Sequence, residues 1–190
     1  NIRQRNKPHE PLSGIISIPG DKSISHRAII FSSMAIGVSR IDGLLESDDI
    51  ISTINCMKKL GARISKRKDG IWEVFGVGVG GFTEPENIID LGNSGTSARL
   101  ISGAVCTSPF KCFFTGDDSL RKRPMDRIID PLTQFGADFV AREKSLLPIC
   151  ILGANDPLGI DFTGKVASAQ VKSAVLIAGL NAIGETRYIE

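Results

Sequence analysis

Three segments of the chain share one pattern, in which small residues form a turn, serines begin a helix, and a cation precedes an apolar run. The segments cover residues 20–30, 92–102 and 166–176. Their cations, Arg27, Arg99 and Lys172, are 72 and 73 residues apart (27 to 99 and 99 to 172). Self-similarity at a fixed period indicates repeated supersecondary units that bury a shared core by packing on one another.

Within each copy the residue pattern predicts alternating strands and helices. Strands are expected at 14–18 and 111–115, where aliphatic and aromatic residues are concentrated. Helices are expected at 23–36, 47–60, 96–106 and 125–135. Two of these helices are followed by a Gly-Ala step, at Gly61 and Gly136, and glycine suits the left-handed residue that closes a helix. We therefore expect an α/β fold of repeated βαβαββ units, two of them whole and a third incomplete at Glu190.

Composition narrows the classes of function. A formal net charge of +2 is too small for a nucleic-acid footprint, and a small anionic ligand fits it better. The cysteines show no CxxC pair and no histidines at metal-ligand spacing, so we expect reduced core thiols and no metal site. They are Cys56, Cys106, Cys112 and Cys150. The longest apolar stretch, 174–180, is far short of the roughly 20 residues that a membrane span needs. A soluble cytoplasmic protein without membrane partners is expected.

The first repeated segment predicts an anion site. Residues 20–28 follow an expected strand and begin a helix, so free backbone N–H groups and the positive end of the helix dipole point to one place. Lys22 adds a charge, Ser23 a hydroxyl, and Arg27 a guanidinium one helical turn further on. A solvated charged face is the competing interpretation, but cations near a helix N-terminus oppose the dipole. The spacing of a P-loop is absent, and His26 is expected to be structural.

The second segment repeats this geometry. Asn93 or Ser94 can cap the helix, and Gly95 leaves space where a ligand can approach the backbone. Further along, three cations precede Pro124, which suits a first helical turn. Of these cations Arg123, next to the proline, is expected to point inward.

The third segment supplies polar groups at a helix start. Ser168 and Gln170 suit sugar hydroxyls and a phosphate oxygen. Lys172 can be read equally as a ligand or as a charge on the helix surface.

These motifs, DKSISHR, GNSGTSA, RKRPM and SAQVKSA, resemble in order and spacing those of the EPSP synthase family, from Ile15 to Glu190. The resemblance implies two lobes, each made of three βαβαββ units in an inside-out α/β barrel. By the same resemblance, residues 1–20 are a strand segment that crosses to the other lobe, and 21–190 form an incomplete lobe. The rest of the protein, the C-terminal half, would hold the general acid and base.

The implied reaction transfers the enolpyruvyl group of phosphoenolpyruvate to the 5-hydroxyl of shikimate-3-phosphate and releases phosphate, with no metal or organic cofactor. Five positions are implied to contact shikimate-3-phosphate: Lys22, Ser23, Arg27, Ser168 and Gln170. Five are implied for phosphoenolpyruvate: Lys22, Asn93, Gly95, Arg123 and Gln170. Lys22, shared by both substrates, is the implied catalytic residue. Ala169 stands where other members carry a second serine, so a hydroxyl contact is lost there.

Two alternatives remain open at this point. A sibling family adds enolpyruvyl to UDP-N-acetylglucosamine, but it opens with a Lys-Asn pair and uses a cysteine-bearing loop, whereas this chain has DKSISHR and RKRPM. The other alternative is a lobe that binds shikimate-3-phosphate without turnover. The family is also the target of glyphosate, which occupies the phosphoenolpyruvate site.

Overall fold

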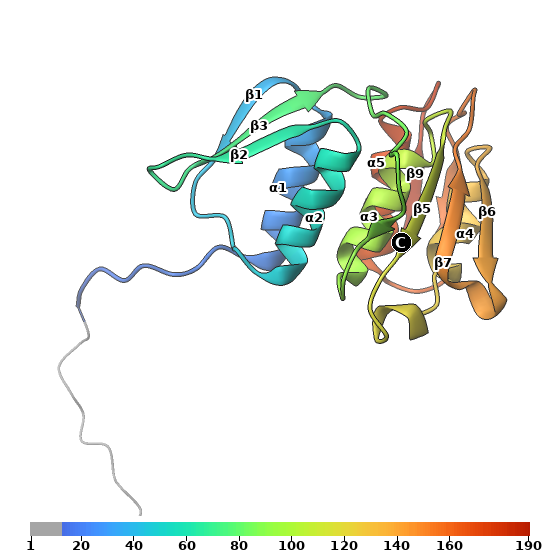
Figure 1. Cartoon of the computed structure of the whole chain (residues 1–190). Coiled ribbons are helices and arrows are strands. Elements are labelled where there is room, and N and C mark those ends of the chain that lie inside the picture. The colour runs from blue at the N-terminus through green and yellow to red at the C-terminus, as the bar shows by residue number, and fades with distance from the viewer. Residues whose placement is uncertain (1–12) are drawn as a thin grey trace, which may run out of the picture.

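The computed structural model describes residues 13–190 (Figure 1). Its helices are α1 (Lys22–Met34), α2 (Asp48–Lys59), α3 (Gly95–Val105), α4 (Asp126–Thr133) and α5 (Ala169–Gly179), with short 3-10 turns η1 (Leu120–Lys122) and η2 (Glu143–Ser145). Its strands are β1 (Ile36–Ile41), β2 (Arg63–Lys66), β3 (Trp72–Val77), β4 (Ile89–Asp90), β5 (Lys111–Thr115), β6 (Asp138–Arg142), β7 (Leu146–Leu152), β8 (Asp161–Thr163) and β9 (Arg187–Ile189). The four predicted helices all form within two residues of their expected bounds, and the strand predicted at 111–115 is β5.

The strand predicted at 14–18 does not form. Residues 13–19 run as extended chain away from the body of the molecule (Figure 1), and Ile15, Ile16 and Ile18 are exposed. A strand needs a neighbour to pair its backbone N–H and C=O groups, and no strand among the described residues pairs with this segment. Residues 1–12 of the predicted crossing segment lie outside the described residues.

The second copy of the repeat carries the whole predicted order, β4-α3-β5-α4-β6-β7. Its sheet has the strand order β4-β5-β7-β6, in which β4 and β5 are parallel and the other pairs are antiparallel. The first copy forms an antiparallel sheet, β1-β3-β2, that matches β5-β7-β6 and leaves β1 at an edge. The third copy begins as the second does: β8 precedes α5 in the sequence, β9 follows it, and the two strands pair in parallel. The protein therefore has a mixed α/β fold in which parts of one topology recur.

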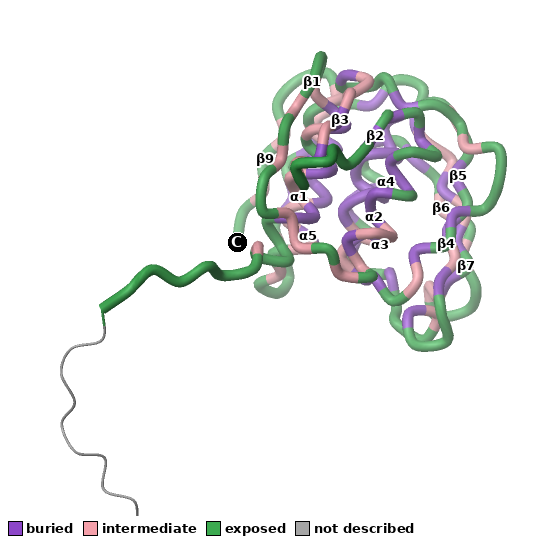
Figure 2. Tube along the Cα trace, turned by 60° about the vertical axis from the view of Figure 1, so that its left-hand side comes forward, coloured by how far each residue is buried: buried purple, intermediate pink, exposed green. Residues whose placement is uncertain are grey.

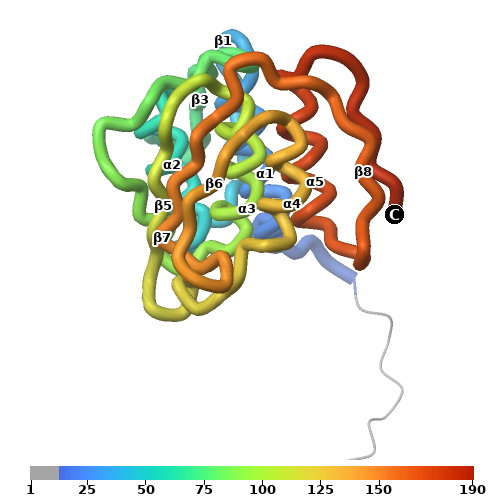
Figure 3. The backbone as a smooth tube through the Cα atoms, turned by 90° about the vertical axis from the view of Figure 1, so that its right-hand side faces the viewer, coloured from blue at the N-terminus to red at the C-terminus, as the bar shows by residue number. Residues whose placement is uncertain are grey.

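The helices lie in the middle of the molecule, and the strands lie around them (Figures 1 and 3). Buried residues are concentrated on these helices (Figure 2), and nearly all of α3 is buried. α3 packs against α5. Their backbones approach closely because Gly103 has no side chain: a Cβ there would lie 2.2 Å from the carbonyl oxygen of Ala174. This crossing holds the two helices in a fixed relation.

Both predicted helix ends are confirmed. Gly61 and Gly136 follow α2 and α4 with φ values of +106° and +95°, the left-handed region that glycine enters without strain. The Gly61 N–H donates to the carbonyl of Lys58 at 3.1 Å, and the Gly136 N–H donates to that of Thr133 at 3.0 Å. These turns satisfy carbonyl groups that the helices leave unpaired.

The cysteines are free thiols, as predicted from their spacing. Three of them, Cys56, Cys106 and Cys112, are buried, whereas Cys150 is only partly so. Burial raises the pKa of Cys112 to about 12. Within residues 13–190, no helix has both the length and the apolar character needed to cross a membrane.

Candidate functional site

Each of the three repeated segments places a capped helix start in the structure. The caps are Asp21 Oδ1, which accepts from the Ile24 N–H at 2.8 Å, Ser94 Oγ, which accepts from the Ser97 N–H at 3.1 Å, and Ser168 Oγ, which accepts from the Val171 N–H at 3.4 Å. Of the two predicted caps of α3, Ser94 is therefore the one used, and the side chain of Asn93 is left for another partner. The remaining N–H groups of each first turn carry partial positive charge.

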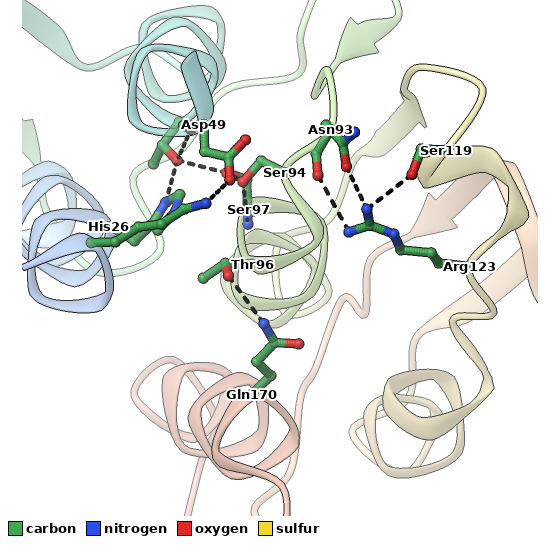
Figure 4. A network of polar contacts seen from close by, with 11 residues as sticks. His26, Asp49, Asn93, Ser94, Thr96, Ser97, Ser119, Arg123 and Gln170 are labelled. Atoms are coloured by element: carbon green, nitrogen blue, oxygen red, sulfur yellow. Dashed lines mark hydrogen bonds and ion pairs between the residues drawn. The ribbon is translucent and has the colours of Figure 1, made fainter. Parts of the chain in front are cut away.

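Side-chain contacts hold these three helix starts side by side. Arg27 of α1 donates from Nη2 to Ser173 Oγ of α5 at 2.8 Å. Gln170 of α5 donates from Nε2 to Thr96 Oγ1 of α3 at 3.0 Å (Figure 4). Three positive helix ends therefore lie in one region, which is the arrangement expected of an anion site.

The loop that precedes α3 is held by Arg123. Its Nη2 donates to Asn93 Oδ1 at 2.5 Å and to Ser119 Oγ at 3.0 Å (Figure 4). Arg123 is exposed, so its guanidinium remains accessible to a ligand. Arg123 is therefore not buried as an inward-pointing cation would be, but its side chain is tied to the loop of the second repeated segment.

Pro124 does not lie in the first turn of a helix, where the sequence had placed it. α4 begins at Asp126 after the cap residue Met125, whose N–H donates to the carbonyl of Ser145 at 2.9 Å. This contact to the η2 turn fixes the chain just before the helix, so the helix starts two residues after the proline. Arg123 therefore extends from the end of η1 rather than from a helix mouth.

Gly95 begins α3 beside two guanidinium groups. Arg99 donates from Nη1 to the carbonyl of Gly95 at 3.1 Å and from Nη2 to that of Pro124 at 3.4 Å. A Cβ on Gly95 would lie 2.8 Å from Arg99 Nη1 and 3.3 Å from Arg123 Nη1. The absence of a side chain at this position leaves room for both cations.

A cavity of about 310 Å³ opens beside these arginines. It is lined by Arg99, Arg123, Pro124, Arg127, Ser168, Gln170 and Val171. Burial lowers the pKa of Arg99, and the positive charges of Arg123 and Arg127 lower it further, while Asp126 opposes the shift. Clustered guanidinium groups repel one another, so a bound anion would stabilise the cluster and accept hydrogen bonds from it.

At the start of α1, Lys22 forms an ion pair with Asp49 of α2, and its side chain is 52% exposed. Ser23 is exposed, and its carbonyl accepts from Arg27 Nη1 at 3.2 Å. A ligand that approaches Lys22 therefore meets a cation whose charge is already shared with a carboxylate.

A sequence model of the family described as EPSP synthase (3-phosphoshikimate 1-carboxyvinyltransferase) matches residues 6–190. The chain belongs to the EPSP synthase family. The 3-phosphoshikimate 1-carboxyvinyltransferase of Paramagnetospirillum magneticum is 55% identical over 180 residues, which are 95% of this chain and 40% of that protein. That of Ruegeria sp. is 56% identical over 189 residues, 100% of this chain and 42% of that protein.

Solved structures of EPSP synthases agree with this assignment. That of the Acinetobacter baumannii enzyme superposes with a TM-score of 0.89 at 43% identity, covering 93% of this chain and 40% of that one. The family resemblance inferred from the motifs is confirmed. The chain spans about 40% of the length of the EPSP synthases that it matches.

Among the positions that the EPSP synthase motifs single out, the structure brings several together. Asn93 contacts Arg123, and Gln170 reaches from α5 to α3. Ser168 and Gln170 line the cavity together with Arg123. Lys172 points elsewhere, since its ammonium lies 2.7 Å from a carboxylate oxygen of Glu190.

Two cavity arginines, Arg99 and Arg127, are not identified as site residues by the sequence. Arg99 did carry a signal, because it lies four residues after Gly95 and therefore on the same face of the helix. Arg127 had none, since it reaches the cavity only through the packing of α4 against α5.

Proposed function

We propose that the protein transfers the enolpyruvyl group of phosphoenolpyruvate to the 5-hydroxyl of shikimate-3-phosphate, with release of phosphate. The observation that supports this most is the arginine-lined cavity between α3 and the starts of α4 and α5, in a member of the EPSP synthase family. Both substrates carry phosphate and a carboxylate. A site for them needs several fixed cations and N–H donors in a confined space.

We assign phosphoenolpyruvate to the loop before α3, where Asn93, Gly95 and Arg123 lie, and where Gln170 approaches from α5. Shikimate-3-phosphate is assigned to the starts of α1 and α5, through Ser23, Arg27, Ser168 and Gln170. Lys22 is the residue shared by both substrates. The two half-sites adjoin because Arg27 and Gln170 already link α1, α3 and α5.

In the proposed reaction the 5-hydroxyl loses its proton and its oxygen bonds to C2 of phosphoenolpyruvate, while the methylene carbon of phosphoenolpyruvate takes up a proton and becomes a methyl group. The tetrahedral intermediate then loses phosphate from C2 and a proton from that methyl group, which forms the enol ether of the product. Lys22 and Arg123 would neutralise charge on the phosphate and carboxylate groups during both steps. The proton transfers need a general acid and base, which we place in a second lobe that closes over this one.

We further propose that residues 21–190 form one incomplete lobe of an inside-out α/β barrel, with 1–20 crossing to the other lobe. α2 packs against both α1 and α3, and α4 packs against both α3 and α5. The corresponding place between α5 and α1 is a groove of about 190 Å³, lined by Phe31, Ser173, Leu176, Ile177 and Leu180. Its apolar lining suits a helix of the third unit. The free thiols support a reducing compartment such as the cytoplasm.

Calorimetry on this chain tests the proposal. We expect shikimate-3-phosphate to bind, phosphoenolpyruvate to bind weakly or not at all, and the mixture to release no phosphate. UDP-N-acetylglucosamine serves as the control ligand of the sibling reaction, and Arg27→Gln as the variant that should weaken shikimate-3-phosphate binding. The full-length gene product should release phosphate from the two substrates. Binding of the UDP-sugar in place of shikimate-3-phosphate would refute the assignment, and turnover by this chain alone would refute the need for a second lobe.

A further inference from the structure

A chain of buried polar side chains connects α1 with the loop before α3. It consists of His26, Thr53, Ser97 and Ser94, each of which is 0% exposed. His26 Nδ1 lies 2.7 Å from Thr53 Oγ1, which lies 2.6 Å from Ser97 Oγ, which in turn lies 2.6 Å from Ser94 Oγ (Figure 4). The chain starts on the helix that carries Lys22 and Arg27 and ends between Asn93 and Gly95.

Counting protons fixes the direction of every bond in this chain, because each hydroxyl has one proton to donate. Thr53 Oγ1 lies 3.1 Å from the carbonyl oxygen of Asp49, which can only accept, so the proton of Thr53 is used there. The contact between Thr53 and Ser97 then needs the Ser97 proton. That between Ser97 and Ser94 needs the Ser94 proton.

The contact between His26 and Thr53 is left with a single possible donor, the Nδ1–H of His26. Only this tautomer satisfies all four hydrogen bonds at once. The Nε2 of His26 then carries a lone pair that has no hydrogen-bond partner among the residues that the structure describes. Burial lowers the pKa of His26 to about 4, with Lys22 and Arg27 acting in the same direction and Asp49 opposing them, so the ring is neutral at pH 7.

We propose that His26 is a positioning residue whose Nδ1–H orders this chain, and that the chain holds the loop from Asn93 to Gly95 ready for phosphoenolpyruvate. Ser94 is the link, because its Oγ accepts from the Ser97 N–H while its proton is directed to Ser97 Oγ. Its neighbours on both sides are the residues assigned to the substrate. A residue on the shikimate-3-phosphate helix thus shapes the phosphoenolpyruvate half-site; the identity of the ligand rests on the proposed function.

The tautomer is tested by ¹⁵N–¹H correlation spectra of the histidine rings of the 190-residue protein at pH 7, with a His9→Gln variant to assign the signals. We expect His26 to be neutral and protonated on Nδ1, although the Nε2–H tautomer is the usual one in water. A ring protonated on Nε2, alone or on both nitrogens, would overturn the proposal. This measurement needs no ligand, so its result is independent of the proposed function.

The positioning role is tested by two variants. In His26→Asn the amide N–H can take the place of Nδ1–H, whereas His26→Leu fills the space without a donor. Backbone amide signals of Asn93, Ser94 and Gly95 should shift in the leucine variant and return towards the parent positions in the asparagine variant. A loop that responds equally to both substitutions, or to neither, contradicts the role.

In the full-length gene product, His26→Leu should raise the KM for phosphoenolpyruvate about five- to tenfold, the effect of one hydrogen bond, and raise the KM for shikimate-3-phosphate less. His26→Asn should restore it. Equal changes in the two KM values, with no recovery in His26→Asn, would mean that the hydrogen-bonded side chains only stabilise the fold. If the leucine variant does not fold, Thr53→Val interrupts the same row of hydrogen bonds from α2. It should likewise raise the KM for phosphoenolpyruvate more than the KM for shikimate-3-phosphate. An inactive parent protein would refute the proposed function and leave the loop signals as the deciding result.

Discussion

Replacing Gly103 by alanine should destabilise the protein, because the added Cβ would meet the main chain of α5. It would lie 2.2, 2.8 and 2.9 Å from the carbonyl oxygen, carbonyl carbon and Cα of Ala174. Since non-bonded carbon atoms pack at about 3.5–4.0 Å, α3 and α5 would have to separate by roughly 1 Å. Overpacking costs about 1–3 kcal/mol, and a clash with main-chain atoms belongs to the upper part of that range, about 2–3 kcal/mol. The better helix propensity of alanine offsets about 1 kcal/mol. We expect a net loss of about 1–2 kcal/mol in the free energy of unfolding.

Urea denaturation followed by circular dichroism measures this loss. Gly95→Ala is the matched control, because it adds the same methyl group to the same helix but its nearest neighbours are side-chain ends, those of Arg99, Arg123 and Leu120. Its free energy of unfolding should stay within about 0.5 kcal/mol of the parent. Combining Gly103→Ala with Ala174→Gly should bring no recovery, since the clash is with backbone atoms. A Gly103→Ala protein as stable as the parent would refute the reasoning.

Four other results are expected. In the full-length gene product, Gly95→Ala should weaken glyphosate inhibition by crowding the phosphoenolpyruvate site; equal inhibition of variant and parent would contradict this. In the same full-length protein, Arg99→Gln should weaken binding of phosphoenolpyruvate about tenfold or more in calorimetry, as expected for a charge-assisted hydrogen bond, without lowering the urea midpoint. The pKa of His26 is about 4 in the folded state and near 6.5 when unfolded. The contribution of the neutral ring to the free energy of unfolding is therefore complete above pH 6.5, and it falls as the pH drops towards 4, because the unfolded chain takes up the proton first. About 2 kcal/mol should be lost between pH 7 and pH 5 in the parent but not in His26→Asn, measured by urea unfolding. In the native protein a thiol reagent should modify Cys150 first, and the three buried cysteines should react only after unfolding.

Much of the fold could be predicted because helix periodicity and the repeat are local properties of the sequence. The spacing of Arg27, Arg99 and Lys172 located three helix starts, and Gly61 and Gly136 located two helix ends. The segment 14–18 failed because a strand is defined by its partner. Its residues favour the extended backbone that they adopt, but no strand within 13–190 pairs with them.

The candidate site could be predicted only where one segment supplied the geometry. Ser168 and Gln170 lie in one helix start, and the pattern identified both as candidates. Arg127 joins the cavity through the packing of two helices, which no local pattern encodes. The buried position of His26 likewise depends on contacts between residues 27 and 44 positions apart, His26 with Thr53 and Thr53 with Ser97. The cap of α3 by Ser94 is a local contact, and the sequence named Ser94 as one of its two candidates.

The edge position of β1 bears on how the chain behaves in concentrated solution. β5, its counterpart in the second copy, is paired on both sides, whereas β1 pairs with β3 alone among the described strands. On β1, Ile36 and Val38 are 93% and 52% exposed. An open edge with apolar side chains is a template for strands of other molecules, and charged residues or a covering segment normally protect it. Self-association of this chain should therefore start at β1, and colloidal stability will depend on what covers that edge.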